Sequence, residues 1–258
     1  MKQLVIFGLG YTASRIGKAL ELSGWTIDAT GRAGNLQFDD EAGVRSALTE
    51  ASHVLSSVPP GECGDPVLHT YGDALGGKWL GYLSSTGVYG DTRGAWVDES
   101  APTGTGRRSA RSDADAAWLE LDARVFRLPG IYGPGRSVLD RILEGKARRI
   151  ELPGQVFSRV HVDDIVSGVV VAIKGGAPSG AYNLADDLPC SQNLVVEEAC
   201  RLLGLEPPQL VTLEQANLSE AALAFYSENR RVANGRAKRM LGWQPRYPSF
   251  KEGLRSLL

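Results

Sequence analysis

The start of the chain carries the feature that most restricts its fold, a glycine turn between a strand pattern and a helix pattern. Residues 4–7 read Leu-Val-Ile-Phe, a continuous apolar run typical of a parallel strand covered on both faces. Gly8 and Gly10 follow at once, and Ala13 completes the spacing G-x-G-x-x-G/A before an apolar helical pattern. Strand, glycine turn and helix in this order predict a dinucleotide-binding turn at the start of a parallel sheet.

Each position of this turn has a physical role in such a site. Gly8 permits the tight turn, Gly10 lets the backbone approach a pyrophosphate, and the small Ala13 lets the helix pack on the strand. The helix then begins with Tyr11 and Thr12, where free N–H groups and the helix dipole favour phosphate. We therefore predict that Gly8, Gly10, Tyr11 and Thr12 bind the cofactor.

The end of the second expected strand, Trp25–Thr30, indicates which dinucleotide is bound. An acidic residue about 20 residues beyond the glycines usually holds the ribose hydroxyls. This chain instead has Arg32 after Gly31. An arginine at this point suits a 2′-phosphate, because its planar fork makes charge-assisted hydrogen bonds. The pattern predicts NADP, with NAD as the alternative if Arg32 is only a solvated loop residue.

The next connection is unusually short. Only residues 31–35 separate the second strand from Leu36-Gln37-Phe38, which we expect to form a short third strand. A parallel crossover through a helix needs a dozen or more residues. Either the helix is missing or the third strand is vestigial, so this edge of the sheet should be truncated and the adenine pocket open.

Composition excludes several classes of function. The chain has 258 residues, enough for one large domain or a domain with a small lobe, and its net charge of −2 gives no reason to expect nucleic acid or an anionic membrane as partner. The three cysteines and three histidines are scattered, so we expect no metal. No apolar stretch is long enough for a membrane helix and no signal peptide is visible, which predicts a cytoplasmic protein.

Strand and helix patterns alternate along the rest of the chain, which is typical of a parallel α/β sheet. Further strands are expected at His53–Val58, Trp79–Ser84, Arg124–Leu128, Phe157–Val162 and Tyr182–Leu184, and further helices at Glu41–Ala51, Asp65–Ala74, Ala110–Leu121, Val138–Leu143, Ile165–Ile173 and Leu194–Leu203. The run Arg230, Arg231, Arg236, Lys238 and Arg239 is locally basic, either as a solvated helix face or as a contact to substrate phosphates.

Several motifs together identify a resemblance. They are SSTGVYG at 84–90, DES-AP at 98–102, RLPGIYGPGR at 127–136, HVDDI at 161–165, YNLADD at 182–187 and LGWQPRYPSFKEGL at 241–254. With the glycine turn, they make the chain resemble the extended short-chain dehydrogenase/reductase superfamily, in its epimerase/dehydratase branch. The resemblance implies a Rossmann-type, doubly wound parallel sheet with a small C-terminal substrate lobe. We expect one unit over 1–258, with a Rossmann core over about 1–130 and a mixed part, 131–258, that holds the lobe and returning sheet elements.

The resemblance also implies chemistry. Family enzymes oxidise or reduce a carbinol carbon with bound NAD(P), often on nucleotide sugars, and often dimerise through the helix that corresponds to Ala110–Leu121. Ser85 lies four residues before Tyr89, where UDP-galactose 4-epimerase and similar enzymes keep a catalytic serine. Thr86 is its neighbour and a candidate substitute. Pro129 matches a position that packs against the nicotinamide, Val58 and Pro59 match the loop that lines the cofactor, and Asp39 matches a residue near the adenine.

The family's Tyr-x-x-x-Lys pair is absent from the corresponding helix. Alignment on the acid that follows the pair places Asp115 at that acid, Arg111 at the lysine and Arg107 at the tyrosine. Arginine does not donate a proton near neutral pH, although Arg107 or Arg111 could stabilise an oxyanion and Arg111 could hold the ribose. If the protein is an enzyme, a hydroxyl of Ser85, Thr86 or Tyr89 must act as the acid.

Two arginines are candidates for binding an anionic substrate. Family members that bind nucleotide diphosphates often have an arginine four residues before the histidine of H-V-D-D, and this chain has Phe157 there. Arg159 lies two residues further on, on the same face of the expected strand, and Arg136 could assist it. Surface pairing is the alternative for both.

Two functions therefore remain open. The first is an NADP-dependent reductase or epimerase-type enzyme with a non-standard proton donor, which the polar strand end Ser84–Thr86 and the substrate lobe favour. The second is a catalytically silent NADP(H)-binding regulator similar to NmrA-type proteins, which the missing tyrosine favours.

Overall fold

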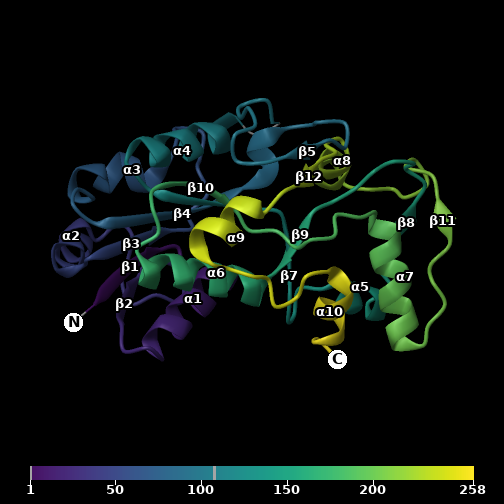
Figure 1. Cartoon of the computed structure of the whole chain (residues 1–258), viewed down its shortest axis with the longest axis horizontal. Coiled ribbons are helices and arrows are strands. Elements are labelled where there is room, and N and C mark those ends of the chain that lie inside the picture. The colour runs from purple at the N-terminus through teal and green to yellow at the C-terminus, as the bar shows by residue number, and fades with distance from the viewer. Residues whose placement is uncertain (1, 107–108) are drawn as a thin grey trace.

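The computed structural model describes residues 2–106 and 109–258. A sheet covered by helices occupies one part of the molecule and a smaller lobe occupies the other (Figure 1). Because Arg107 lies outside the described residues, its predicted role is not addressed by the structure.

The central sheet has six parallel strands in the order β10-β6-β4-β3-β1-β2. They are β1 (Gln3–Phe7), β2 (Thr26–Ala29), β3 (His53–Ser56), β4 (Trp79–Ser85), β6 (Arg124–Leu128) and β10 (Gly180–Asn183). Side chains alternate across the sheet, so that Leu4 and Ile6 of β1 enter one core cluster and Val5 and Phe7 enter the other. This two-faced burial explains the continuous apolar runs in the sequence and confirms the predicted Rossmann-type sheet.

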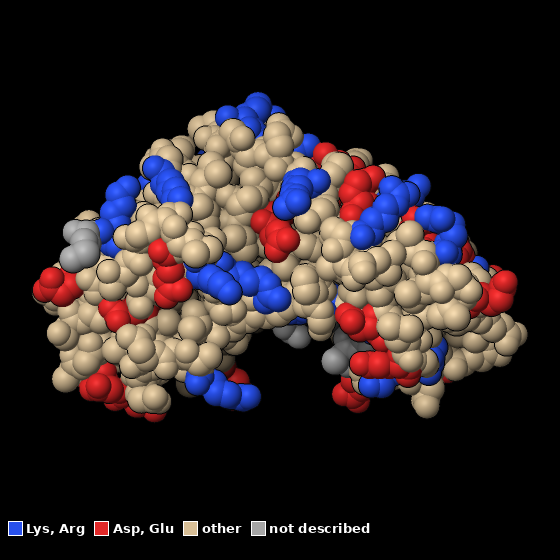
Figure 2. All heavy atoms as spheres, turned by 90° about the horizontal axis from the view of Figure 1, so that it is seen from below, with Lys and Arg blue, Asp and Glu red and all other residues tan. Residues whose placement is uncertain are grey.

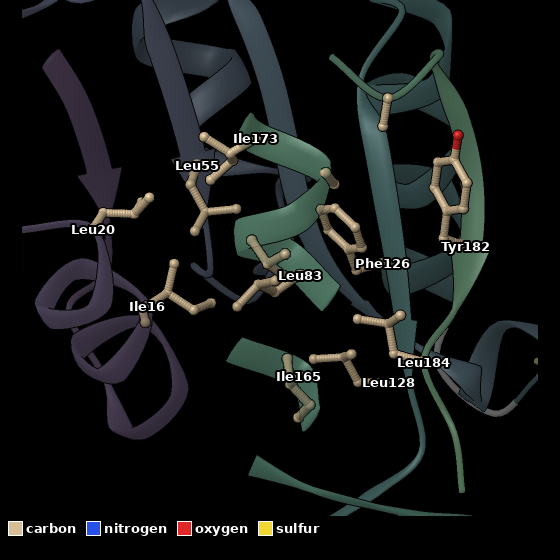
Figure 3. Packing of buried hydrophobic residues seen from close by; sticks show 14 of the residues in the cluster. Ile16, Leu20, Leu55, Leu83, Phe126, Leu128, Ile165, Ile173, Tyr182 and Leu184 are labelled. Carbon is tan, nitrogen blue, oxygen red and sulfur yellow. The ribbon is translucent and has the colours of Figure 1, made fainter. Parts of the chain in front are cut away.

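Helices cover both faces of the sheet. One face is covered by α1 (Tyr11–Glu21), α6 (Val162–Gly175) and α9 (Gly235–Leu241), and the other by α2 (Glu41–Glu50), α3 (Pro66–Tyr71) and α4 (Ser109–Glu120). Ile16 of α1 and Ile165 of α6 belong to the same buried cluster as Leu83 of β4 and Phe126 of β6 (Figure 3). Full burial of such a side chain contributes about 1.5–3 kcal/mol, so this layer anchors the strand ends that carry the site.

The truncated sheet edge is confirmed, but the expected strand at Leu36–Phe38 is wrong. Residues 31–40, all of them described, contain no helix, and only Leu36 pairs with the sheet, through a single bridge to Thr30. The amide of Asn35 explains this geometry: its Nδ2 donates to Asp28 Oδ1 at 2.7 Å and its Oδ1 accepts from the Ala29 N–H at 2.8 Å. These bonds fold the loop back on β2 before a third strand can extend.

The lobe is built from short elements. Its strand pairs are β7 (Gly130–Tyr132) with β9 (Arg159–His161), β8 (Arg149–Ile150) with β11 (Leu210–Val211), and β5 (Trp96–Val97) with β12 (Arg231–Val232). Its helices are α5 (Val138–Leu143), α7 (Gln192–Leu203), α8 (Glu220–Tyr226) and α10 (Phe250–Arg255). A separate apolar cluster holds α5, α7 and α10 together. Since β7 follows β6 directly, the lobe is fixed to the carboxyl ends of the sheet strands.

Several boundaries differ from the predictions. The strand expected at Phe157–Val162 is confined to Arg159–His161, because Phe157 instead forms an antiparallel bridge with Cys190. The helix expected from Ile165 begins at Val162, where the His161 ring accepts a hydrogen bond from the Asp163 N–H. The helix expected at Asp65–Ala74 ends at Tyr71 and continues as a 3-10 turn, η1 (Gly72–Ala74). Such differences arise from tertiary pairing and capping that periodicity does not report.

No described helix is both long and apolar enough to cross a bilayer. Likewise, the described residues contain no group of three or more His, Cys, Asp or Glu side chains that could hold a metal ion.

Candidate functional site

The glycine turn between β1 and α1 has the geometry of a cradle. Gly8 has a φ of +84°, and a Cβ added to it would lie 3.1 Å from both Ser57 Oγ and Val58 Cγ2. A Cβ added to Gly10 would meet nothing within 4 Å. Gly8 is therefore required by the turn itself, whereas Gly10 leaves open space in front of the backbone.

The start of α1 faces this open space. Gly10 is its N-cap in an extended conformation, no side chain caps it, and no acidic residue lies in its first turn. The N–H groups at Tyr11 and Thr12 are the helix donors that an anion can satisfy. These residues fit the pyrophosphate of a dinucleotide, as predicted from the spacing.

Neighbouring loops hold the cradle in place. Ser57 Oγ donates to the carbonyl oxygen of Gly8 at 2.5 Å, and the Gly8 N–H donates to Thr30 Oγ1 at 3.1 Å. Val58 lies beside the turn, 3.1 Å from a Cβ added to Gly8, and Pro59 follows it in the chain.

Beyond β2, Arg32 and Asp39 are exposed. The acidic residue of β2 is Asp28, but its carboxylate accepts from the amides of Gln3 and Asn35, each at 2.7 Å. Asp28 is therefore engaged with protein amides. This leaves Arg32 as the charged residue at the predicted ribose position.

The carboxyl ends of β4 and β6 border a polar cavity of about 390 Å³. This cavity, called the reaction cavity below, brings together residues from two separate sequence motifs and Arg111 of α4. Its wall includes the predicted residues Ser85, Thr86, Arg111, Pro129 and Arg136.

Ser85 is held in a defined orientation. It is the N-cap of the 3-10 helix η2 (Thr86–Tyr89), and its Oγ accepts a hydrogen bond of 3.1 Å from the Gly87 N–H. Because the oxygen is used as an acceptor, the hydroxyl hydrogen is left to donate to a ligand. Its neighbour Ser84 is buried and donates to Asp115 Oδ2 at 2.6 Å, so Ser84 stabilises the fold.

Tyr89, also a predicted acid, lies in the protein interior. Its hydroxyl donates to Asn183 Oδ1 at 2.8 Å and accepts from the Arg127 guanidinium at 3.0 Å. Burial raises the pKa of the Tyr89 hydroxyl. Tyr89 is not among the residues that line the reaction cavity. The structure does not bring Tyr89 into the cavity, and no other tyrosine of the described chain lines it.

Arg111 occupies the position that the family's lysine would take. It donates to the phenol oxygen of Tyr82 at 2.7 Å. Burial raises the pKa of Tyr82 to about 12, so this partner is neutral at pH 7. The positive charge of Arg111 is therefore not cancelled by its partner and can act on a ligand in the cavity.

Two cavity residues, Glu228 and Arg230, were not predicted as site residues. Arg230 donates to Glu228 at 2.8 Å and to the carbonyl oxygen of Gly90 at 2.6 Å. For Arg230 the sequence did carry a signal, because contact with substrate phosphates was one interpretation of the basic run that begins there. Lys238 of the same run instead pairs with Asp187 on the outside.

A second cavity of about 600 Å³ lies in the lobe and is called the lobe cavity below. The two cavities adjoin, because they share the lining residues Gly130, Ile131, Arg136, Phe157 and Ser158. From below, the outline of the molecule is hollowed between its sheet part and its lobe, and charges of both signs are interspersed on this face (Figure 2).

Arg159 also lines the lobe cavity, but the protein engages its donors. One guanidinium nitrogen donates to the carbonyl oxygens of Phe157 and Cys190, at 2.9 and 3.1 Å, and the other donates to the Gln192 amide at 2.9 Å. Arg136 in contrast is exposed, and its guanidinium lies 5.6 Å from the centre of the Tyr11 ring. Of the two predicted anchors, Arg136 is the one whose charge is presented to a ligand.

Comparison with known proteins gives one relative that matches in part and one that matches over nearly its whole length. No family model matches the chain. A 3-diazoavenalumate denitrifying reductase from Streptomyces is 31% identical over 172 residues, which span 62% of this chain and 55% of that protein. Protein YeeZ of Escherichia coli is 25% identical over 96% of this chain and 97% of its own length. The chain thus matches about half the length of the reductase.

Solved structures match over the whole chain. A conserved protein of unknown function from Silicibacter pomeroyi is 38% identical, covers 100% of this chain and 98% of its own, and has a TM-score of 0.89. A Bacillus anthracis dTDP-glucose 4,6-dehydratase in complex with NAD is 17% identical over 100% of this chain and 95% of its own, with a TM-score of 0.77. A human epimerase family protein with NADPH is 15% identical over 99% and 98%, with a TM-score of 0.78.

These similarities show the fold of the protein. The chain has the fold of solved epimerase/dehydratase structures, as the sequence motifs predicted. Within that fold, the chain belongs to the same family as the conserved Silicibacter pomeroyi protein.

Proposed function

We propose that this protein binds a nicotinamide dinucleotide at the β1–α1 turn and reduces a carbonyl-type substrate in the reaction cavity. The observation that carries the proposal is the meeting of Ser85, Thr86 and Arg111 in one cavity beside Pro129. The partial relative from Streptomyces is named a reductase, which supports this direction of reaction. Related folds are solved with NAD or NADPH, which supports a nicotinamide cofactor.

When bound, the reduced nicotinamide would supply a hydride to the substrate carbon. The chain's own residues would then stabilise the charge that develops on the substrate oxygen. Ser85 would donate its hydroxyl hydrogen to that oxygen, since accepting from the Gly87 N–H uses only a lone pair of the serine oxygen, and solvent would then return a proton to the serine. Arg111 adds a fixed positive charge without giving up a proton. Thr86, which lines the same cavity, offers a second hydroxyl.

The proposed cofactor is NADP rather than NAD. Arg32 is exposed at the end of β2, where a 2′-phosphate would lie, and Asp28 is engaged by Gln3 and Asn35. The Asp28 carboxylate is therefore not free to hold ribose hydroxyls, whereas the Arg32 guanidinium is suited to bind a phosphate.

A regulator that binds NADP(H) without turnover is the second candidate. It is favoured by the position of Tyr89, whose hydroxyl is held by Arg127 and Asn183 and not presented to a ligand. The adjoining reaction and lobe cavities favour an enzyme, since a sensor of the dinucleotide has no need of a separate substrate compartment.

A cofactor-binding experiment tests the common part of both candidates. Gly10→Glu fills the open cradle with a carboxylate, so NADPH binding measured by calorimetry should be lost. Gly72→Glu is the matched control, because a Cβ there also meets nothing within 4 Å but the position ends α3, outside the cradle. Equal NADPH affinity in the two variants would refute the site. NADPH oxidation with a library of carbonyl compounds then separates the enzyme from the regulator.

A further inference from the structure

Arg136 stands where the two cavities meet. Five residues line both cavities, and Arg136 is the one charged side chain among them. In the described structure, no carboxylate lies within ion-pair distance of its guanidinium. A guanidinium without a carboxylate partner at a cavity junction is suited to bind a ligand anion.

Part of the lobe cavity beyond this junction is apolar, although Asp140, Arg141, Glu144, Arg148 and Arg159 also line the cavity. Phe157 and Tyr226 meet edge to face, with ring centres 5.4 Å apart, and both line this cavity. Val195 and Val196 of α7 line it as well. Phe250 and Leu254 of α10 close the same wall. Such a surface binds an aromatic or aliphatic group by burial of apolar area.

The junction itself supplies one guanidinium for a negative charge. Phe157 occupies the position where the family resemblance would place a diphosphate-binding arginine, and the donors of Arg159 are engaged by the protein. Arg141 and Arg148 are exposed at the rim, where they donate to backbone carbonyl oxygens of residues 145–147. At the junction a single guanidinium remains, and its planar fork matches one carboxylate.

We propose that the substrate is a carboxylic acid monoanion: Arg136 binds its carboxylate, and the lobe cavity takes its aromatic or apolar group. This inference rests on the proposed function, because the reacting carbonyl would then lie in the reaction cavity beside Ser85. A nucleoside diphosphate should bind less tightly, since its second charge would have no further guanidinium at the junction itself.

Binding of three probes tests the inference without requiring turnover. Phenylpyruvate, its methyl ester and uridine diphosphate are titrated into the full chain by calorimetry, with and without NADP⁺. Phenylpyruvate should bind about ten-fold or more tightly than the ester, because a hydrogen bond to a charged group is worth that factor. Arg136→Gln should remove this difference and leave ester binding unchanged. Arg201→Gln, on the exposed face of α7, is the matched control.

The outcomes separate this inference from the proposed function. Tighter binding of uridine diphosphate, equal binding of acid and ester, or an unchanged Arg136→Gln variant would overturn the monoanion inference. If phenylpyruvate binds through Arg136 but neither NADPH nor NADH binds, the proposed function fails and only the carboxylate-binding site at Arg136 remains. If NADPH binds and phenylpyruvate does not, the cofactor site holds and the inference fails.

Discussion

Arg127 and Asp115 form an ion pair in the protein interior, with Nη2 of Arg127 2.7 Å from Oδ1 of Asp115 and both side chains no more than 4% exposed. Nε of Arg127 also donates to Oδ2 of Asp115, which accepts from Ser84 as well. The same guanidinium donates to the hydroxyl of Tyr89. The pair therefore links α4, β4, β6 and η2, the elements that position Ser85 in the reaction cavity.

Removal of one partner of this pair should destabilise the fold strongly. Asp115→Ala leaves the Arg127 charge buried without compensation, which costs about 3–5 kcal/mol. Urea unfolding followed by circular dichroism measures the loss. Asp113→Ala is the matched control, because Asp113 lies on the same helix but is exposed, so its substitution should change stability by less than about 0.5 kcal/mol. Equal losses in the two variants would contradict the importance of the pair.

Ser85→Ala should slow the chemical step without weakening cofactor binding. Loss of the donated hydrogen bond is expected to reduce single-turnover NADPH oxidation by about 10²–10⁴-fold with any accepted substrate. NADPH affinity should stay nearly unchanged, since the proposed phosphate site is at Gly8 and Gly10, away from Ser85. Thr86→Val, which removes the neighbouring hydroxyl, serves as the comparison and should have the smaller effect. Equal rates in the wild type and Ser85→Ala would remove Ser85 from the mechanism.

Arg32→Asp should reverse the cofactor preference. A charge-assisted contact to the 2′-phosphate is worth about 1.5–3 kcal/mol, so the wild type should bind NADP(H) roughly ten-fold or more tightly than NAD(H). The aspartate would repel the phosphate and accept from ribose hydroxyls. Lys18→Asp, at the opposite end of α1, controls for the change in net charge and should leave the preference intact. A wild type with equal affinities for the two cofactors would refute the role of Arg32.

Local sequence patterns predicted those parts of the fold that local chemistry determines. The apolar run before Gly8, the glycine spacing and the polar end of β4 are each contained in a few residues, and the structure places them as expected. The strand at Leu36–Phe38 was predicted wrongly, because the side-chain bonds of Asn35 that fold the loop back on β2 leave no periodic signal.

Which residues line the reaction cavity depends on tertiary contacts more than on local sequence patterns. Tyr89 was a reasonable candidate for the acid until its partners were known, and one of them, Asn183, comes from the last strand of the sheet. Arg230 reaches the reaction cavity because β12 pairs with β5. Neither pairing could be inferred from spacing along the chain, although the motifs had already brought Ser85, Pro129 and Arg136 to the same expected site.

Because of the Asp186 carboxyl, the free energy of unfolding should fall as pH rises. Its side chain is 2% exposed, and burial raises the pKa of its carboxyl to about 8, although Arg159 opposes this shift. The unfolded value is about 3.9, so between about pH 4 and 8 the folded state retains a proton that the unfolded state has lost. The stability that this proton confers is fully present below about pH 4 and is lost as pH rises through the folded pKa.

Asp186→Asn should flatten this pH dependence, because the amide keeps the shape of the neutral acid and does not ionise. From pH 5 to pH 8 the wild type should lose about 2–4 kcal/mol more unfolding free energy than the variant, as measured by urea unfolding at each pH. Asp113→Asn, at an exposed position, should follow the wild-type profile. Parallel pH profiles for the wild type and Asp186→Asn would show that the Asp186 carboxyl is already ionised in the folded protein at neutral pH.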